Sequence, residues 1–156
     1  TVEDAQAILS LIQELSIFER EPEAVVLTKE DLVRDGFGEQ PAFVCFVAEG
    51  NKQIMGMALG YPRYSTWKGK TMHLEDLIVK EEHRGKRVGF ALYKRFIHYA
   101  ASLHVKRIEW AVLDWNQPAI DFYEQTGAKV LSDWRTVQMG ENEISHFINQ
   151  YPDADI

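Results

Sequence analysis

The sequence of 156 residues predicts an α/β fold in which a mixed sheet is flanked by helices. The first sign is a change in the spacing of apolar residues: Thr71–Val79 reads as a strand, whereas from Val88 onward apolar residues recur at helical spacing. The second is a pair of strand-like runs, residues 42–49 and 53–64, separated by the turn Gly50-Asn51-Lys52. This arrangement predicts an antiparallel hairpin.

Two helices are expected before the hairpin. Thr1 with Asp4 forms a capping-box-like start, and Thr28 with Asp31 repeats that signal for a short helix closing near Gly36. After the first start, apolar residues follow at helical spacing: Ile8, Leu11, Ile12, Leu15 and Phe18.

The C-terminal half continues the alternation of strands and helices. A strand is predicted from Arg107 to Leu113, and a helix over residues 117–125, with Asn116 near its cap. Pro118 lies in its first turn, and Gly127 ends it where a left-handed residue is usual. Strands are predicted from Ala128 to Met139 and a loose tail over 151–156. Without internal repeats or low-complexity linkers, we expect one domain, 1–156.

Composition narrows the function classes. A net charge of −7 argues against a general nucleic-acid binder, because neutralising phosphates needs clustered cations. We expect no membrane partner, because no apolar run has membrane length and no signal-peptide pattern occurs. Cys45 is the single cysteine, so an intrachain disulfide is impossible and a cytoplasmic location is expected. The five histidines lack metal-ligand spacing, so no metal is expected.

A basic turn between the strand ending at Val79 and the helix beginning near Val88 predicts an anion site. The N–H groups and dipole at the start of that helix favour negative charge, and Gly85 and Gly89 let a ligand approach the backbone. Formal charge comes from Arg84, Lys86 and Arg87. Neither GxxxxGK[ST] nor GxGxxG occurs, so the turn is not a Walker loop or a dinucleotide fingerprint. The anion expected is a pyrophosphate.

The turn resembles the coenzyme site of the GCN5-related N-acetyltransferase (GNAT) superfamily, Arg/Gln-x-x-Gly/Ala-x-Gly/Ala, with Arg87 standing at the middle Gly/Ala position. The stretch from Asn116 to Ala128, N-x-P-A-x-x-F-Y-x-x-x-G-A, resembles the second coenzyme-contacting element of the same superfamily. Three segments are most similar to the spermidine/spermine (diamine) and thialysine N-acetyltransferases: Leu27–Glu39, Leu74–Val79 and Asp114–Tyr123. Compared with those enzymes, we expect this sequence to lack the short first strand. The expected fold is therefore GNAT-like, with a mixed, mostly antiparallel sheet.

The resemblance implies direct acetyl transfer from acetyl-CoA to a primary amine, with Glu75 as base or amine anchor and Tyr123 as the general acid. Adjacent residues of a regular strand point to opposite faces, so Asp76 is expected to be a structural partner. The backbone of the strand end is expected to pair with the pantetheine arm. The implied coenzyme-binding residues are Leu77, Ile78, Val79, Arg84, Gly85, Lys86, Arg87, Val88, Gly89, Phe90, Asn116 and Tyr123.

The substrate implied is a small cationic amine, namely a polyamine, a diamine or a thialysine-like amine. Phe18 and Glu19 match an aromatic–acid pair that contacts polyamine, and Asp133 lies near an acid that reaches the neighbouring subunit's site. The resemblance also implies a homodimer that exchanges C-terminal elements. Two alternatives stay open: another acceptor, such as a protein N-terminus or an aminoglycoside, and a coenzyme A-binding module without turnover.

Overall fold

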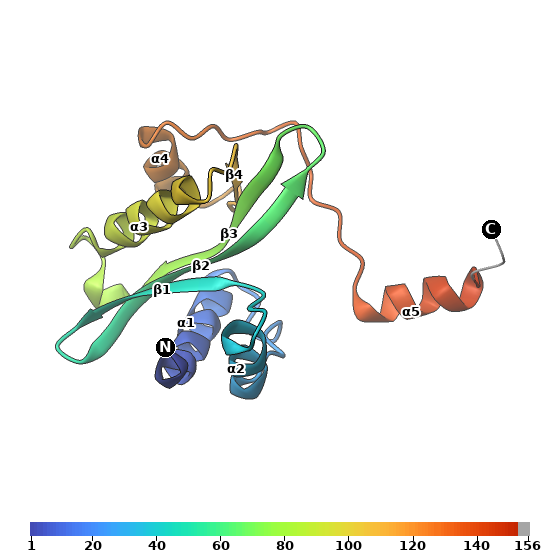
Figure 1. Cartoon of the computed structure of the whole chain (residues 1–156), viewed down its shortest axis with the longest axis horizontal. Helices are drawn as coiled ribbons and strands as arrows, with labels where there is room; N and C mark the ends of the chain where they lie inside the picture. Colours follow the sequence, from blue (N-terminus) through green and yellow to red (C-terminus); the bar gives the residue numbers. More distant parts are fainter. Residues whose placement is uncertain (153–156) are drawn as a thin grey trace. The chain divides into compact units, whose positions relative to one another are not determined.

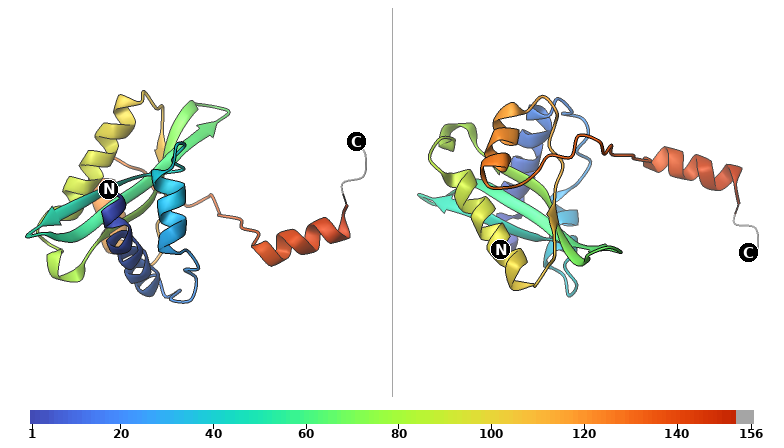
Figure 2. Two further views of the ribbon diagram at one scale, coloured as in Figure 1. Left: turned by 60° about the horizontal axis from the view of Figure 1, so that its bottom comes forward. Right: turned by 90° about the horizontal axis from the view of Figure 1, so that it is seen from above.

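A computed structural model of the chain describes residues 1–152. The chain divides into two compact units, Thr1–Leu113 and Asp114–Ile156. The first unit contains the sheet, with four strands in the order β1-β2-β3-β4 (Figure 1). Helix α3 lies on one face of this sheet and helices α1 and α2 lie on the other, as the views in Figure 2 also show.

The first unit is built from helices and strands with the following bounds: 3-10 helix η1 (Val2–Asp4), α1 (Ala5–Phe18), α2 (Lys29–Phe37), β1 (Val44–Gly50), β2 (Gln53–Ser65), β3 (Gly69–Val79), 3-10 helix η2 (Glu81–His83), α3 (Val88–Ser102) and β4 (Ile108–Glu109). Both predicted capping boxes are present, at Thr1 with Asp4 and at Thr28 with Asp31. Each joins a threonine to the aspartate three residues on, which fixes where the helical segment begins.

The predicted hairpin is confirmed. Strands β1 and β2 pair antiparallel, from Val44 opposite Gly60 to Gly50 opposite Gln53. The turn residues Asn51 and Lys52 have φ values of 51° and 62°. Two successive left-handed residues are the signature of a type I′ turn, whose twist matches that of the strands.

The predicted strand from Arg107 to Leu113 is much shorter in the structure. Only Ile108–Glu109 forms a strand, pairing parallel with Met72 and His73 of β3. Beyond His73, β3 contains a bulge, and a bulge bends its strand away from regular pairing. The sheet is mixed and mostly antiparallel, as predicted.

The core of the first unit lies on both faces of the sheet. Helices α1 and α2 pack against one face through a cluster of Ile8, Leu9, Leu11, Leu32, Met57 and Ile78. On the other face, Phe96 of α3 is completely buried against Gly60, where any Cβ would clash with its ring. Gly60 is therefore required for close packing of α3 on the sheet.

The second unit contains α4 (Gln117–Gln125) and α5 (Glu141–Gln150). Helix α4 has the predicted bounds. The predicted strands from Ala128 to Met139 are wrong, since residues 128–140 form no strand. Residues 114–152 contain no strand at all, and a single isolated strand there would leave its backbone groups unpaired.

Helix α5 was missed from the sequence, although its signals are local. Glu141 and Glu143 lie in its first turn, and Ile144, Phe147 and Ile148 follow at helical spacing. In the predicted loose tail, residues 151 and 152 are outside any helix, and residues 153–156 lie outside the described part of the chain. Within residues 1–152, no helix is both long and apolar enough to cross a membrane.

Candidate active site

Glu75 and Asp76 lie at an irregularity of the β2–β3 ladder. Leu59 pairs with Asp76, whereas its neighbour Gly60 pairs with Leu74, so Glu75 is an extra residue without a partner on β2. Such a β-bulge breaks the alternation of faces and redirects side chains. The expectation that Glu75 and Asp76 point to opposite faces is therefore wrong, and both line the same pocket.

This pocket has a volume of about 280 Å³ and lies on the α1–α2 side of the sheet. Its walls combine apolar side chains with carboxylates: Ile12, Leu27, Leu32, Asp35, Ala42, Phe43, Leu59, Glu75 and Asp76. Asp35 is already paired with Arg34, whose Nε and Nη2 each donate to one of its carboxylate oxygens at 2.8 Å. Glu75 and Asp76 are therefore the carboxylates of this pocket that can take a cationic ligand.

Three carboxylates interact around the bulge. Burial, together with the nearby charges of Glu75 and Glu19, raises the pKa of Asp76 to about 6. Burial and the charge of Glu75 also raise the pKa of Glu19. A site that gathers three like charges favours a cation. Asp76 was expected to have only a structural role, because the bulge has no local sequence signal.

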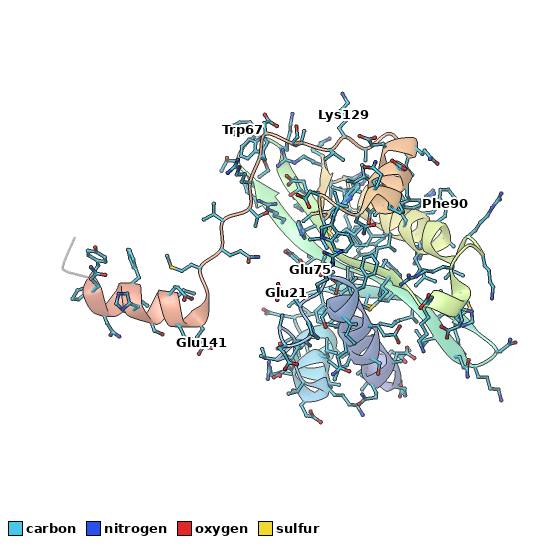
Figure 3. All side chains as sticks on the ribbon, turned by 180° about the vertical axis from the view of Figure 1, so that it is seen from behind. Glu21, Trp67, Glu75, Phe90, Lys129 and Glu141 are labelled. Carbon is cyan, nitrogen blue, oxygen red and sulfur yellow. The ribbon has the colours of Figure 1, made fainter. Side chains whose placement is uncertain are left out.

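Two polar side chains contact Glu75, which lies on the sheet with about half of its side chain exposed (Figure 3). His73 Nε2 is 3.5 Å from Glu75 Oε2. The Tyr61 hydroxyl donates a hydrogen bond to Glu75, and burial together with this bond raises the pKa of Tyr61. Tyr61 and His73 were not predicted as site residues, since they approach Glu75 only once β2 and β3 are paired.

The end of α1 contributes Phe18 and Glu19. Glu19 is the C-cap of α1, so its side chain follows directly from where the helix ends. The guanidinium of Arg84 lies 5.7 Å from the centre of the Phe18 ring, within cation–π range. Phe18 therefore lies beside the basic turn, and Glu19 lies beside the carboxylates of β3.

The basic turn has the geometry of an anion site. Helix α3 begins without a side-chain cap, and its first internal hydrogen bond runs from the N–H of Ala91 to the carbonyl of Arg87. The N–H groups of Val88, Gly89 and Phe90, at the start of the helix, therefore precede any helical partner. Gly85, with φ of 71°, supplies the left-handed residue that the turn needs.

Two basic side chains of the turn form hydrogen bonds to nearby backbone carbonyls. Arg84 Nε donates to the carbonyl of Val79 at 3.0 Å, and Lys86 Nζ donates to the carbonyl of Glu82 at 2.8 Å. Arg87 is the N-cap of α3 and has a left-handed φ of 63°. The middle position of the motif, where glycine or alanine was expected, thus has a backbone conformation that glycine adopts without strain.

The end of β3 has one unpaired edge. Its ladder with β4 stops at His73, whereas its ladder with β2 continues to Val79. Among residues 1–152, the stretch from Leu77 to Val79 has no strand partner on the β4 side, although the carbonyl of Val79 already accepts from Arg84 Nε. An extended ligand arm that carries amides could bind there as a further strand would.

In the second unit, Asn116 and Tyr123 lie on α4. Asn116 Oδ1 accepts a hydrogen bond of 3.4 Å from the N–H of Ala119, which caps the helix. Tyr123 packs edge-to-face on Phe122, with ring centres 5.3 Å apart. Asp133 is exposed in the segment between α4 and α5. The first unit thus contains Phe18, Glu19, Glu75 and the basic turn, and the second contains Asn116, Tyr123 and Asp133.

The family model described as Acetyltransferase (GNAT) family matches residues 6–128. The chain belongs to the GNAT acetyltransferase family. The predicted family and fold class are confirmed. This GNAT enzyme is 40% identical over 138 residues to the thialysine N-epsilon-acetyltransferase of Bos taurus. The aligned stretch covers 83% of this chain and 81% of that relative.

A second relative of this GNAT enzyme is the human spermidine/spermine N(1)-acetyltransferase-like protein 1. The two are 35% identical over 151 residues, or 90% of this chain and 22% of that protein. Among solved structures, an integron cassette protein of V. cholerae superposes with a TM-score of 0.76 at 20% identity, covering 94% of this chain and 93% of that one. That likeness supports the fold.

GNAT enzymes use acetyl-CoA, and the first unit of this one fits such a ligand. The start of α3 offers N–H groups to phosphates, and the free edge of β3 offers backbone groups to an amide-containing arm. Among residues 1–152, no group of three or more His, Cys, Asp and Glu side chains is arranged to hold a metal ion.

Proposed function

We propose that this GNAT enzyme acetylates a primary amine of a small cationic acceptor of the polyamine, diamine or thialysine class. The observation that carries this proposal is the interaction of Glu19, Glu75 and Asp76 around one bulge. Three carboxylates in partly buried surroundings repel one another, and a ligand with more than one positive charge relieves that repulsion. The names of the two relatives agree with this acceptor class.

The pocket supports an acceptor that combines charge with an alkyl chain. Its carboxylates lie among apolar side chains such as Ile12, Leu32 and Phe43. Methylene groups between two cationic nitrogens would contact these walls while the nitrogens face acids. An acceptor with a single charge would leave part of the repulsion uncompensated.

In the proposed reaction, acetyl-CoA supplies an activated acetyl thioester. Glu75 accepts a proton from the ammonium group of the acceptor, directly or through water, which frees the nitrogen lone pair for attack. A backbone N–H of the β3 end, from Leu77 to Val79, stabilises the oxyanion that develops on the acyl oxygen. Tyr123 donates its phenolic proton to the departing thiolate. A thiolate is basic enough to accept this proton, because the pKa of a thiol lies far above that of a carboxylic acid and nearer to that of a phenol.

The proposed coenzyme site is formed by the free edge of β3 and the turn before α3. The pyrophosphate binds the N–H groups at the start of α3, with Lys86 and Arg87 adding charge and Arg84 holding the turn to Val79. Phe90, half exposed on the first turn of α3, covers the ligand from the side. Asn116 contacts the pantetheine arm beside Tyr123.

We further propose a cytoplasmic homodimer that exchanges C-terminal elements and places Asp133 near the partner's site. The second unit supports this arrangement, because many of its large apolar side chains are exposed: Val130, Leu131, Trp134, Val137, Met139, Ile144, Phe147, Ile148 and Tyr151. Exposed apolar surface of this extent marks an interaction site. Sedimentation of the full chain should give the mass of two copies, and a monomeric mass would contradict the exchange.

A thiol-release assay over a panel of amines tests the proposed function. With acetyl-CoA, we expect release in the presence of spermidine, short diamines and thialysine, and much less with butylamine, a peptide N-terminus or an aminoglycoside. If thiol is released only with the peptide or only with the aminoglycoside, that compound represents the acceptor class and the proposal is wrong. Tight acetyl-CoA binding without thiol release from any amine would indicate a binding module.

A further inference from the structure

Two aromatic residues on neighbouring strands lie close to the Glu75 carboxylate. Tyr61 of β2 and His73 of β3 lie directly opposite each other in the ladder, and their rings stack with centres 5.1 Å apart and planes 28° apart. The Tyr61 hydroxyl donates to Glu75, and His73 Nε2 lies 3.5 Å from Glu75 Oε2. Two polar groups therefore converge on one carboxylate from a stacked, rigid pair of rings.

The surroundings of His73 favour one tautomer. Its Nδ1 is buried and has no hydrogen-bond partner among residues 1–152. A ring with its hydrogen on Nε2 donates toward Glu75 and leaves Nδ1 as a bare acceptor. The opposite tautomer would bury an N–H group without an acceptor, which costs free energy, and would lose the donor toward Glu75.

Glu75 needs such support because its neighbours oppose it. It is the extra residue of the bulge, and about half of its side chain is exposed, so neither strand pairing nor packing fixes the carboxylate. Asp76 on the same strand and Glu19 at the end of α1 repel it. Donors from Tyr61 and His73 offset this repulsion and hold the charge at one position.

We propose that His73 and Tyr61 are positioning residues that hold Glu75 where it can take the proton of the acceptor amine. The inference rests on the proposed role of Glu75. In the step itself, an N–H bond of the ammonium group breaks, its electron pair stays on nitrogen, and the proton passes to a carboxylate oxygen of Glu75. In this proposal His73 acts only as a hydrogen-bond donor and takes no part in the proton transfer. Glu75 can return the proton to solvent, because its side chain is partly exposed.

The test compares substitutions that keep or remove each donor. His73→Leu removes the donor, whereas His73→Gln keeps an N–H near the position of Nε2. Tyr61→Phe keeps the stacked ring and removes only the hydroxyl. We expect His73→Leu and Tyr61→Phe to lower kcat/KM for the amine on the order of tenfold, the scale of a hydrogen bond to a charged group, and to leave acetyl-CoA affinity unchanged. His73→Gln should recover most of the loss, and His98→Leu, at an exposed histidine of α3, is the matched control.

A double-mutant cycle separates positioning from general structural support. In a Glu75→Gln background, His73→Leu should lower kcat/KM by less than about twofold, because its effect passes through the missing carboxylate. An equal loss in both backgrounds, or no rescue by His73→Gln, would overturn the inference. Wild-type activity in Glu75→Gln alone would instead overturn the proposed base. If His73→Leu does not fold, the same cycle with Tyr61→Phe decides.

Discussion

Leu59 on β2 is paired with Asp76 on β3, and the register shifts by one residue immediately beyond this pair. The shift changes which side chains face α1 and α2: His73 and Glu75 face them before the shift, and Asp76 faces them after it. One extra residue thus places two neighbouring acids in one pocket.

Asp76 makes stability depend on pH. Its pKa is about 6 in the folded chain against 3.8 as the ordinary value, so the folded state holds this proton more tightly. The stabilisation is complete below pH 3.8 and is lost as pH rises through 6. Asp76→Asn should therefore raise the free energy of unfolding on the order of 2–3 kcal/mol at pH 8 and little at pH 4, measured by urea denaturation.

The matched control for this prediction is Asp31→Asn. Hydrogen bonds from Thr28 and Arg34 lower the pKa of Asp31 to about 2, so its carboxylate stabilises the fold above that range. Loss of Asp31 should destabilise at pH 8, opposite in sign to Asp76→Asn. If both variants change stability with the same pH dependence, the raised pKa of Asp76 in the folded chain is contradicted.

Arg87→Gly should separate stability from coenzyme binding. Because Arg87 has a left-handed φ of 63°, glycine should raise the free energy of unfolding by about 1 kcal/mol. Loss of its charge should weaken coenzyme A binding by less than about tenfold, measured by calorimetry. Lys52→Gly, at φ of 62° in the β1–β2 turn, should give the same stabilisation with unchanged binding.

Tyr123→Phe should lower turnover about 10²-fold, the low end for loss of a general acid, because no phenolic proton reaches the departing thiolate. Coenzyme A binding should change little, since the ring is retained. Thiol release measures the first quantity and calorimetry the second. Tyr64→Phe, at a residue that is 74% exposed, is the control, and unchanged turnover in Tyr123→Phe would remove this residue from the mechanism.

Glu19→Gln should weaken diamines more than monoamines. It removes one of the negative partners around the bulge, so the KM of a diamine should rise about tenfold while that of butylamine changes little. Glu21→Gln, an exposed acid two residues on, controls for the change of net charge. Equal losses for both substrate types would show that Glu19 does not bind the second cation.

Local signals predicted much of the fold. Thr28 with Asp31 and the Asn51-Lys52 turn act within a few residues of the chain, and the structure has both. Non-local pairing caused the errors: β4 shortens because β3 bends beyond His73, and residues 128–140 have no strand to pair with in their unit. Helix α5 shows a different cause, because its apolar spacing was present in residues 141–150 but no element was predicted there.

For the candidate site, the sequence can place residues whose position follows from one element, such as Glu19 at the end of α1. Asp76, Tyr61 and His73 could not be found in that way. Their roles depend on the register between β2 and β3, and a one-residue shift in that register has no composition signal.

The short β3–β4 ladder has a consequence for handling the protein. Between His73 and Val79, the side of β3 away from β2 has no strand partner among residues 1–152, and its backbone groups can pair with a strand of another molecule. If the pantetheine arm binds there, the bound coenzyme covers this unpaired edge and keeps other strands from pairing with it. Enzyme stripped of its coenzyme should then self-associate through this edge, and saturating coenzyme A should suppress the association without any change in the chain.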